Sequence, residues 1–125
     1  MGGDKPVLVA GPARLVCDGR EVAPVTVADS AGSRRKGLLG TSTVEGALWI
    51  TRCPSVHMIG MRYAIDAATV DRDGRVLDVR TLSPWTGATW PRRGASATIE
   101  AAAGSMARWG VTVGSVLQVR DGALS

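Results

Sequence analysis

Residues 65–81 read Ile-Asp-Ala-Ala-Thr-Val-Asp-Arg-Asp-Gly-Arg-Val-Leu-Asp-Val-Arg-Thr. Two extended runs, 65–71 and 75–81, flank Arg72-Asp73-Gly74. An Asp-Gly step between two such runs is a strong signal for a tight turn. This stretch therefore predicts an antiparallel β-hairpin, and strand signals also dominate on both sides of it.

Further strands are expected from short β-branched runs bounded by turn residues. In the first third of the chain, Gly-Pro and Asp-Gly steps separate such runs and predict an antiparallel meander. The expected strands, besides the hairpin, cover residues 7–10, 13–17, 22–28, 47–51, 55–58, 98–102 and 116–120.

Two short helical segments are expected between the strands. Asp29-Ser30 can cap a helix over residues 31–39 that stops at Gly40. Residues 105–109 can form a single helical turn between two glycines. Between residues 82 and 95 lies a loop containing Pro, Gly and Trp, and loops of that length tend to be functional or mobile.

Length and composition bound the fold class. A chain of 125 residues suits a single domain over residues 1–125, with a core at about 6–120 and termini expected to fray. Aromatic residues make up 4% of the chain, so Val, Leu, Ile and Ala must fill the core, which favours strands. We predict a mainly β fold: an antiparallel β-sandwich or partly closed barrel with one or two short helices.

Charge and motifs narrow the expected partners. The net charge of +4 permits contact with polyanions, but the basic residues are spread along the chain, so nucleic acid is not an expected partner. No glycine-rich phosphate motif occurs, and no cofactor is predicted. Two cysteines do not make a disulfide framework. No membrane span or signal peptide is recognised, so we expect a cytoplasmic protein, or an exported one if a signal peptide was trimmed from the chain.

Five motifs together resemble a known family. They are Arg35-Lys36-Gly37-Leu38-Leu39-Gly40, Val56-His57-Met58-Ile59-Gly60-Met61-Arg62-Tyr63-Ala64-Ile65-Asp66, Asp71-Arg72-Asp73-Gly74-Arg75-Val76, Ile99-Glu100-Ala101-Ala102-Ala103-Gly104 and Gly110-Val111-Thr112-Val113-Gly114-Ser115-Val116-Leu117. Their order and spacing over residues 28–119 resemble the bacterial and archaeal family known as domain of unknown function 192. The resemblance implies a small, mostly β protein and no particular activity. Ala64 stands where the family usually has Pro.

The stretch from Cys53 to Asp71 concentrates the unusual side chains. Thiolate, imidazole and thioether ligands suit Cu(I), which makes Cys53, His57 and Met61, with Met58, candidate metal ligands. In an extended strand, positions four apart lie roughly 13 Å from each other, which argues against one shared ion. A soft-metal site is therefore kept as an alternative.

A second alternative is a small hydrolase-like enzyme that uses His57 with Asp66 or Glu100. Such chemistry also needs an activated nucleophile, and no Gly-x-Ser-x-Gly motif occurs. We therefore predict no catalytic residues and disfavour an enzyme. Both carboxylates can instead be structural, accepting backbone N–H groups or pairing with Arg62 or Arg35. The run Arg34-Arg35-Lys36 is interpreted as a solvated face with one Arg turned inward.

The preferred interpretation is a non-catalytic binding or accessory module for a small ligand or a protein partner. If residues 55–63 are extended, burial of Val56 and Met58 turns His57 outward, because strand side chains alternate. Two Trp in the loop over residues 82–95 can form an amphipathic patch beside Arg92-Arg93, or can close the core. The candidate ligand-binding residues are His57, Arg62, Asp66, Trp85 and Trp90.

Overall fold

The structure is a computed structural model that describes residues 6–121. In this range the elements follow the order β1 (Val7–Val9), β2 (Ala13–Cys17), β3 (Arg20–Ala28), α1 (Ala31–Lys36), β4 (Thr43–Glu45), β5 (Ala47–Ile50), β6 (Ile65–Val70), β7 (Val76–Leu82), β8 (Ala97–Ala102), α2 (Ser105–Arg108) and β9 (Leu117–Arg120). No helix in the described part of the chain is long and apolar enough to cross a membrane. The fraying expected at the ends falls mainly on residues 1–5 and 122–125, which lie outside the described residues.

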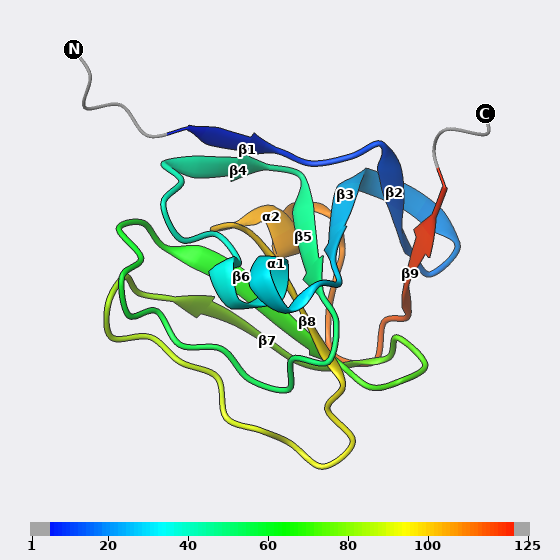
Figure 1. Cartoon of the computed structure of the whole chain (residues 1–125). Helices are drawn as coiled ribbons and strands as arrows, with labels where there is room; N and C mark the ends of the chain where they lie inside the picture. Colours follow the sequence, from blue (N-terminus) through cyan, green and yellow to red (C-terminus); the bar gives the residue numbers. More distant parts are fainter. Residues whose placement is uncertain (1–5, 122–125) are drawn as a thin grey trace.

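Seven strands form one mixed sheet that curls into a half-barrel, in the order β7-β6-β8-β5-β3-β2-β9 (Figure 1). Neighbouring strands are antiparallel except β3 and β5, which are parallel. The two edges meet at one end, where the Leu117 N–H donates to the Gly74 carbonyl over 2.8 Å. The Val76 N–H also donates to the Ser115 carbonyl over 2.8 Å. The predicted mainly β fold with a partly closed barrel and two short helices is confirmed, and the parallel pair makes its sheet mixed.

The hairpin predicted over residues 65–81 is confirmed as β6 and β7, which pair antiparallel. Asp71 shapes the turn, because its Oδ1 accepts hydrogen bonds from the backbone N–H groups of Asp73 and Arg75 at 2.9 and 3.0 Å. Gly74 has a φ of +84°, and a side chain on it would run into the Leu117 carbonyl oxygen. A glycine is needed here both for the turn and for the contact that closes the barrel.

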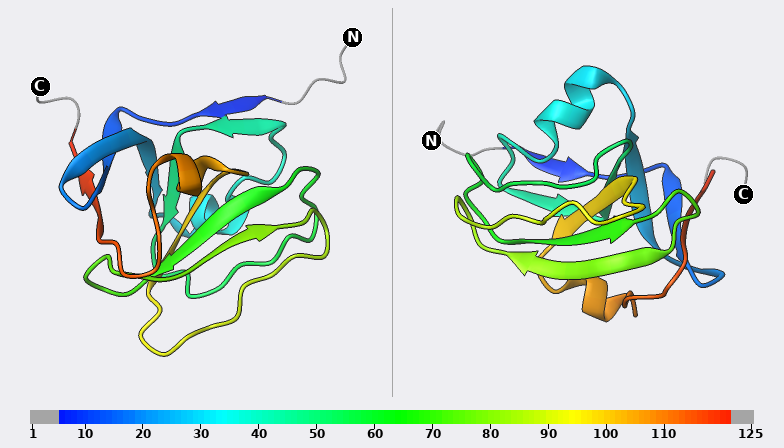
Figure 2. Two further views of the ribbon diagram at one scale, coloured as in Figure 1. Left: turned by 180° about the vertical axis from the view of Figure 1, so that it is seen from behind. Right: turned by 90° about the horizontal axis from the view of Figure 1, so that it is seen from below.

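Each face of the sheet carries its own hydrophobic cluster. The first cluster packs under α2 and includes Leu15, Val25, Val70, Ile99, Met106 and Leu117. The second cluster packs under α1 and the segment 51–64 and includes Leu38, Leu48, Ile50, Met58, Met61 and Ile65. The two helices accordingly lie on opposite sides of the sheet (Figure 2). A residue's position along its strand therefore decides which of the two clusters its side chain joins.

The strand predicted over residues 55–58 is wrong. The segment 51–64 is irregular and makes one isolated antiparallel bridge, between His57 and Ala88. The long loop over residues 82–95 runs beside it: the Met58 N–H donates to the Gly87 carbonyl and the Thr89 N–H to the Val56 carbonyl, both over 2.9 Å. The two irregular segments thus satisfy each other's backbone groups.

Two further expectations are corrected. The first third of the chain is not one antiparallel meander: β2 and β3 form a hairpin, whereas β1 pairs with β4 in parallel. The first helix ends at Lys36 and not at residue 39. Gly37 has a φ of +50°, which ends the helix and turns Leu38, 2% exposed, into the second cluster.

Candidate functional site

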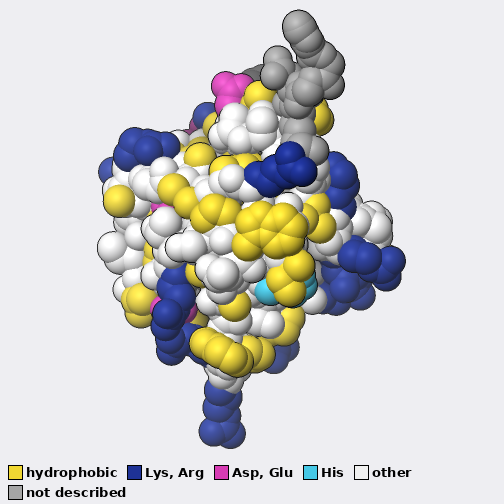
Figure 3. Space-filling model, turned by 90° about the vertical axis from the view of Figure 1, so that its left-hand side faces the viewer, with side chains coloured by type: hydrophobic (Ala, Val, Ile, Leu, Met, Phe, Trp, Pro, Cys, Tyr) yellow, Lys and Arg dark blue, Asp and Glu magenta, His cyan; other side chains and the backbone are white. Residues whose placement is uncertain are grey.

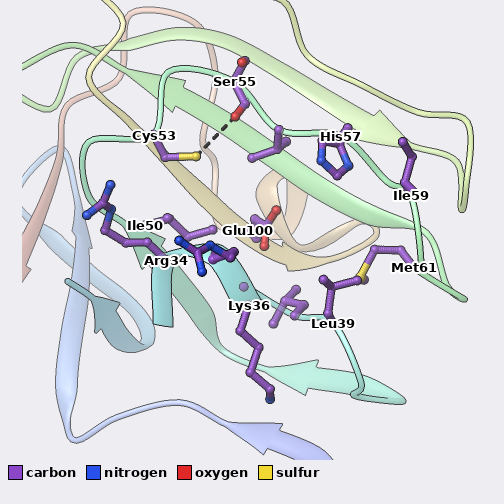
Figure 4. A pocket seen from close by; sticks show the side chains of 14 residues that line it. Arg34, Lys36, Leu39, Ile50, Cys53, Ser55, His57, Ile59, Met61 and Glu100 are labelled. Atoms are coloured by element: carbon purple, nitrogen blue, oxygen red, sulfur yellow. Dashed lines mark hydrogen bonds between the residues drawn. The ribbon is translucent and has the colours of Figure 1, made fainter. Parts of the chain in front are cut away.

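A pocket of about 250 Å³ opens on the face of the sheet that carries α1 (Figure 4). Its walls come from α1 and the residues after it, the end of β5, the segment 53–61 and β8. Much of the wall is apolar and includes Leu38, Leu39, Ile50, Val56, Ile59 and Met61. The polar lining brings together three cationic side chains, a thiol, an imidazole and one carboxyl group.

The cationic side chains come from α1, whose start is fixed by a capping box. Ser30 Oγ accepts from the Ser33 N–H over 3.1 Å, and the Ser30 N–H donates to Ser33 Oγ over 3.1 Å. The last turn carries Arg34, Arg35 and Lys36. Cations at the carboxyl end of a helix interact favourably with the helix dipole. None of the six helical residues is buried, so Leu38 just beyond them anchors the helix to the sheet.

Glu100 is the carboxyl group on the pocket floor. Glu100 lies in β8 between Leu48 of β5 and Ala67 of β6, and the residue is 6% exposed. Among residues 6–121 its carboxyl group has no hydrogen-bond or salt-bridge partner. Burial raises the pKa of Glu100 to about 7, from an ordinary value of 4.5. Near neutral pH this group can therefore either accept or donate a hydrogen bond.

The three cations do not neutralise that carboxyl group. Within the described residues, the side chains of Arg34, Arg35 and Lys36 take part in no hydrogen bond or salt bridge. The Nε atom of Arg34 is buried without an acceptor. Buried polar groups normally have partners, so unpaired groups of both signs around one pocket call for an explanation.

Cys53 and His57 contribute the thiol and the imidazole of the pocket lining. The Cys53 Sγ lies 3.3 Å from the Ser55 carbonyl oxygen, to which the thiol donates (Figure 4). Burial raises the pKa of the Cys53 thiol, so it is a poor nucleophile. His57 is exposed at the rim, and the imidazole of this single His is seen among apolar side chains on the surface (Figure 3).

Comparison with known protein families shows which family this chain matches. The profile of domain of unknown function 192 (DUF192), described as Uncharacterized ACR, matches residues 14–119. The chain belongs to the DUF192 family. The expected resemblance over residues 28–119 is thus confirmed, and the match begins earlier, within the β2–β3 hairpin.

Two solved structures share the fold of this DUF192 chain. One is a protein of unknown function from Novosphingobium aromaticivorans DSM 12444, with a TM-score of 0.71, 21% identity and coverage of 86% of this chain and 83% of that chain. The other, from Sinorhizobium meliloti 1021, is described as a "putative transcription regulator", with a TM-score of 0.70, 22% identity and coverage of 86% and 91%. No curated protein matches the chain. At these identities the structures show the fold alone.

The DUF192 fold brings the three candidate metal ligands to one pocket but does not cluster them. Cys53, His57 and Met61 all line it, although Cys53 and Met61 stand at opposite ends of the view (Figure 4). Met61 is 5% exposed and belongs to the second cluster, as does the fully buried Met58. In residues 6–121 no group of three or more His, Cys, Asp or Glu side chains is arranged to hold a metal ion.

The remaining candidate ligand-binding residues lie away from the pocket. Asp66 points to the opposite face of the sheet, where Oδ2 accepts from the Gly104 and Met106 N–H groups at 3.0 Å each. Arg62 is exposed beside a smaller pocket near Gly40 and Thr41. Two Trp side chains of the loop over residues 82–95 are exposed and do not line the main pocket; they are Trp85, 56% exposed, and Trp90, 76% exposed.

Sequence reasoning missed the cations of α1 as pocket residues and gave Glu100 a different role. A signal for Glu100 was present: one carboxyl group stands inside the small apolar run Thr98 to Ala102 of a central strand. Strand alternation places such a residue on a buried face. For Arg34 and Lys36, the short helical segment offers no comparable signal, because the other residues that line the pocket come from segments far away in the sequence.

Proposed function

We propose that this DUF192 domain is a non-catalytic module that binds a small ligand in the pocket above Glu100. The observation that carries the proposal is the carboxyl group of Glu100, a residue that is 6% exposed, which lies at the floor of an open pocket without a protein partner among residues 6–121. Burial of an unpaired ionisable group costs stability. Such groups are typical of binding sites, where a ligand supplies the missing partner.

The pocket dimensions suit a metabolite. Its volume of about 250 Å³ lies just below the 300–1,000 Å³ typical of drug-sized ligands. Its walls combine apolar side chains with several polar and charged groups, and small-molecule sites likewise use polar groups in an apolar lining to orient the ligand. A protein partner would need a larger contact area than this depression offers, so the small ligand is preferred.

The same residues support a hydrolytic enzyme less well than a binding module. His57 and Glu100 line one pocket, but no hydrogen bond joins them within the described chain. Burial raises the pKa of the Cys53 thiol, so Cys53 is not an activated nucleophile of the kind that covalent catalysis requires.

Soft-metal binding is the second candidate, because Cys53, His57 and Met61 share the pocket wall. A Cu(I) titration under reducing conditions tests it separately. Binding that is lost in His57→Ala would support a metal site, and an unchanged thermal midpoint across the titration would reject it.

The binding proposal is tested by thermal shift of the full chain against a library of small metabolites, since a ligand selective for the native state raises its stability. Each hit is repeated with Arg34→Ala and with Arg93→Ala, an exposed Arg outside the pocket. We expect at least one hit whose shift is lost in Arg34→Ala and kept in Arg93→Ala. No hit, or hits insensitive to Arg34→Ala, would contradict the proposal.

A further inference from the structure

We propose that the ligand is a small amino carboxylate, of the size of a free amino acid with an apolar side chain, whose ammonium group meets Glu100 and whose carboxylate meets the cations of α1. This inference rests on the proposed function and narrows it to a ligand class. Three features of the pocket carry it: an unpaired buried carboxyl group, unpaired cations, and an apolar wall.

The first feature is Glu100. Its carboxyl group lies at the bottom of the pocket between β5 and β6. Gly37 is close by: a Cβ built on it would lie 3.4 Å from Glu100 Oε1. No protein donor in residues 6–121 reaches the carboxyl group, so a donor on a ligand would meet no competing protein group there. The strongest donor for a buried carboxylate is a cationic N–H group, because charge-assisted hydrogen bonds are stronger than neutral ones.

The second feature is the set of cations on α1. Arg34 is half-buried, and it lines the pocket with no acceptor for its side chain in the described chain. Arg35 and Lys36, both exposed, line the same pocket from the next two positions. Guanidinium groups match carboxylates geometrically and bind them with two parallel hydrogen bonds. A carboxylate near the mouth would satisfy this side of the pocket.

The third feature is the apolar wall between the two charged regions. Ile50, Val56 and Met61 belong to it, and the whole pocket measures about 250 Å³. Burying an apolar side chain there is favourable, and the volume limits that side chain to a modest size. Together the three features describe one compact molecule with two charges and an apolar branch.

A ligand with a single charge fits the pocket less well. The carboxyl group and the cations are not paired with each other, so an anion alone would leave the ionised form of Glu100 without a donor. An amine alone would leave the guanidinium of Arg34 without an acceptor. Leaving a buried polar group unpaired costs affinity, which is why the zwitterion is preferred.

Binding of an ammonium group also predicts proton release. The charged and titratable groups at the pocket are Arg34, Arg35 and Lys36 on α1, Cys53 and His57 on the irregular segment, and Glu100 on the sheet. Because burial raises the pKa of Glu100 to about 7, part of the free protein is protonated there at neutral pH. An ammonium partner favours the charged carboxylate, so the proton leaves on binding.

The experiment is a thermal-shift screen of the twenty common amino acids, followed by calorimetry on the best one and its two single-charge analogues. For leucine the analogues are 4-methylpentanoate, which lacks the ammonium group, and 3-methylbutylamine, which lacks the carboxylate. We expect the amino acid to bind at least 10-fold more tightly than either analogue. Calorimetry at pH 7 in two buffers of different ionisation enthalpy should show net proton release.

Variants assign the contact to Glu100. Glu100→Gln should weaken amino-acid binding at least 10-fold and abolish proton release, whereas Glu45→Gln, the same substitution at an exposed position of β4, should change neither. A deaminated analogue that binds as tightly as the amino acid would overturn the inference. An absence of amino-acid binding would also overturn it. In that case a library hit lost in Arg34→Ala leaves the proposed function standing, whereas the lack of any such hit rejects both.

Discussion

At the residue scale, Glu100 sets the pH dependence of stability. The unfolded chain releases the Glu100 proton near pH 4.5 and the folded chain near 7, so between these values the folded state holds the extra proton. Stability therefore falls as pH rises through this window. The full loss, present above about pH 7, is at most about 3 kcal/mol by the usual conversion of pKa shifts.

Glu100→Gln removes this penalty. In urea unfolding experiments at pH 4, 5.5 and 8, we expect the variant to become more stable than the wild type as pH rises, by up to about 3 kcal/mol at pH 8. Glu45→Gln controls for the loss of one negative charge at an exposed site. A difference between wild type and Glu100→Gln that stays constant from pH 4 to 8 would contradict the account.

Asp66 has a structural role that its family motif does not reveal. Its carboxylate accepts from two backbone N–H groups at the start of α2 and from Thr81 Oγ1 over 2.6 Å. The Asp66→Asn substitution replaces one carboxylate oxygen with an NH2 group. Either this group would face one of the present donors, or the remaining hydrogen bonds would lose their charge assistance. We expect a loss of about 2–3 kcal/mol in the free energy of unfolding, measured by urea denaturation at pH 7.

The outcome for Asp66→Asn separates two roles. If Asp66 served a ligand and not the fold, the variant would unfold at the same urea concentration as the wild type. Ligand binding at the pocket on the other side of the sheet should survive the substitution, because Asp66 does not line that pocket.

Residue-scale prediction from sequence succeeded where the chemistry is local. The Asp-Gly turn at residues 73–74 and the capping role of Ser30 need only neighbouring residues, and both are present in the structure. An accepting role for Asp66 toward backbone N–H groups was also predicted. Its donors, 38 and 40 residues away, could not be read from the sequence. Glu100 and the cations of α1 are likewise far apart in the sequence, so their proximity could not be predicted from it.

At the element scale, the half-barrel closes through the turn between β6 and β7. Gly74 and Gly19 have nearly equal φ values, +84° and +85°, but only at Gly74 would a side chain meet backbone, the carbonyl of Leu117. The pair of variants Gly74→Ala and Gly19→Ala therefore separates the cost of the contact from the cost of the left-handed backbone.

We expect Gly74→Ala to lower the free energy of unfolding by about 1–3 kcal/mol more than Gly19→Ala, because overpacking against backbone forces a shift. Chemical denaturation of both variants measures the difference. Equal losses would show that the backbone at the Gly74–Leu117 contact adjusts to the added methyl group at no extra cost. That result would contradict closure of the barrel edges at this contact.

Secondary-structure elements could be predicted where a strand-like sequence pattern pairs with the next segment along the chain. The hairpin of β6 and β7 combines two extended runs with a matching turn, so its prediction held. The segment 51–64 has similar extended runs but irregular backbone, because its partner is the loop over residues 82–95 and not a neighbouring strand. The parallel pairings of β1 with β4 and of β3 with β5 join segments far apart in sequence, which turn signals cannot indicate.

At the scale of the whole molecule, we expect no dedicated nucleic-acid surface, because the basic residues are spread along the sequence. Lys and Arg side chains appear scattered around the face that carries the single His (Figure 3). We expect fluorescence anisotropy with a DNA duplex near physiological salt to give binding no tighter than the non-specific range, about 10⁻⁴–10⁻⁶ M. Tighter binding that depends on DNA sequence would contradict this expectation.

The account as a whole depends on one property of the folded protein: an ionisable group, buried and without a protein partner, at the floor of an open pocket. Its most direct test is an NMR titration of the Glu100 side-chain carboxyl carbon in the ligand-free protein. We predict a titration midpoint near pH 7, as burial without a partner requires. A midpoint at or below the ordinary value of 4.5 would show that the carboxylate is solvated or paired, and would contradict the account.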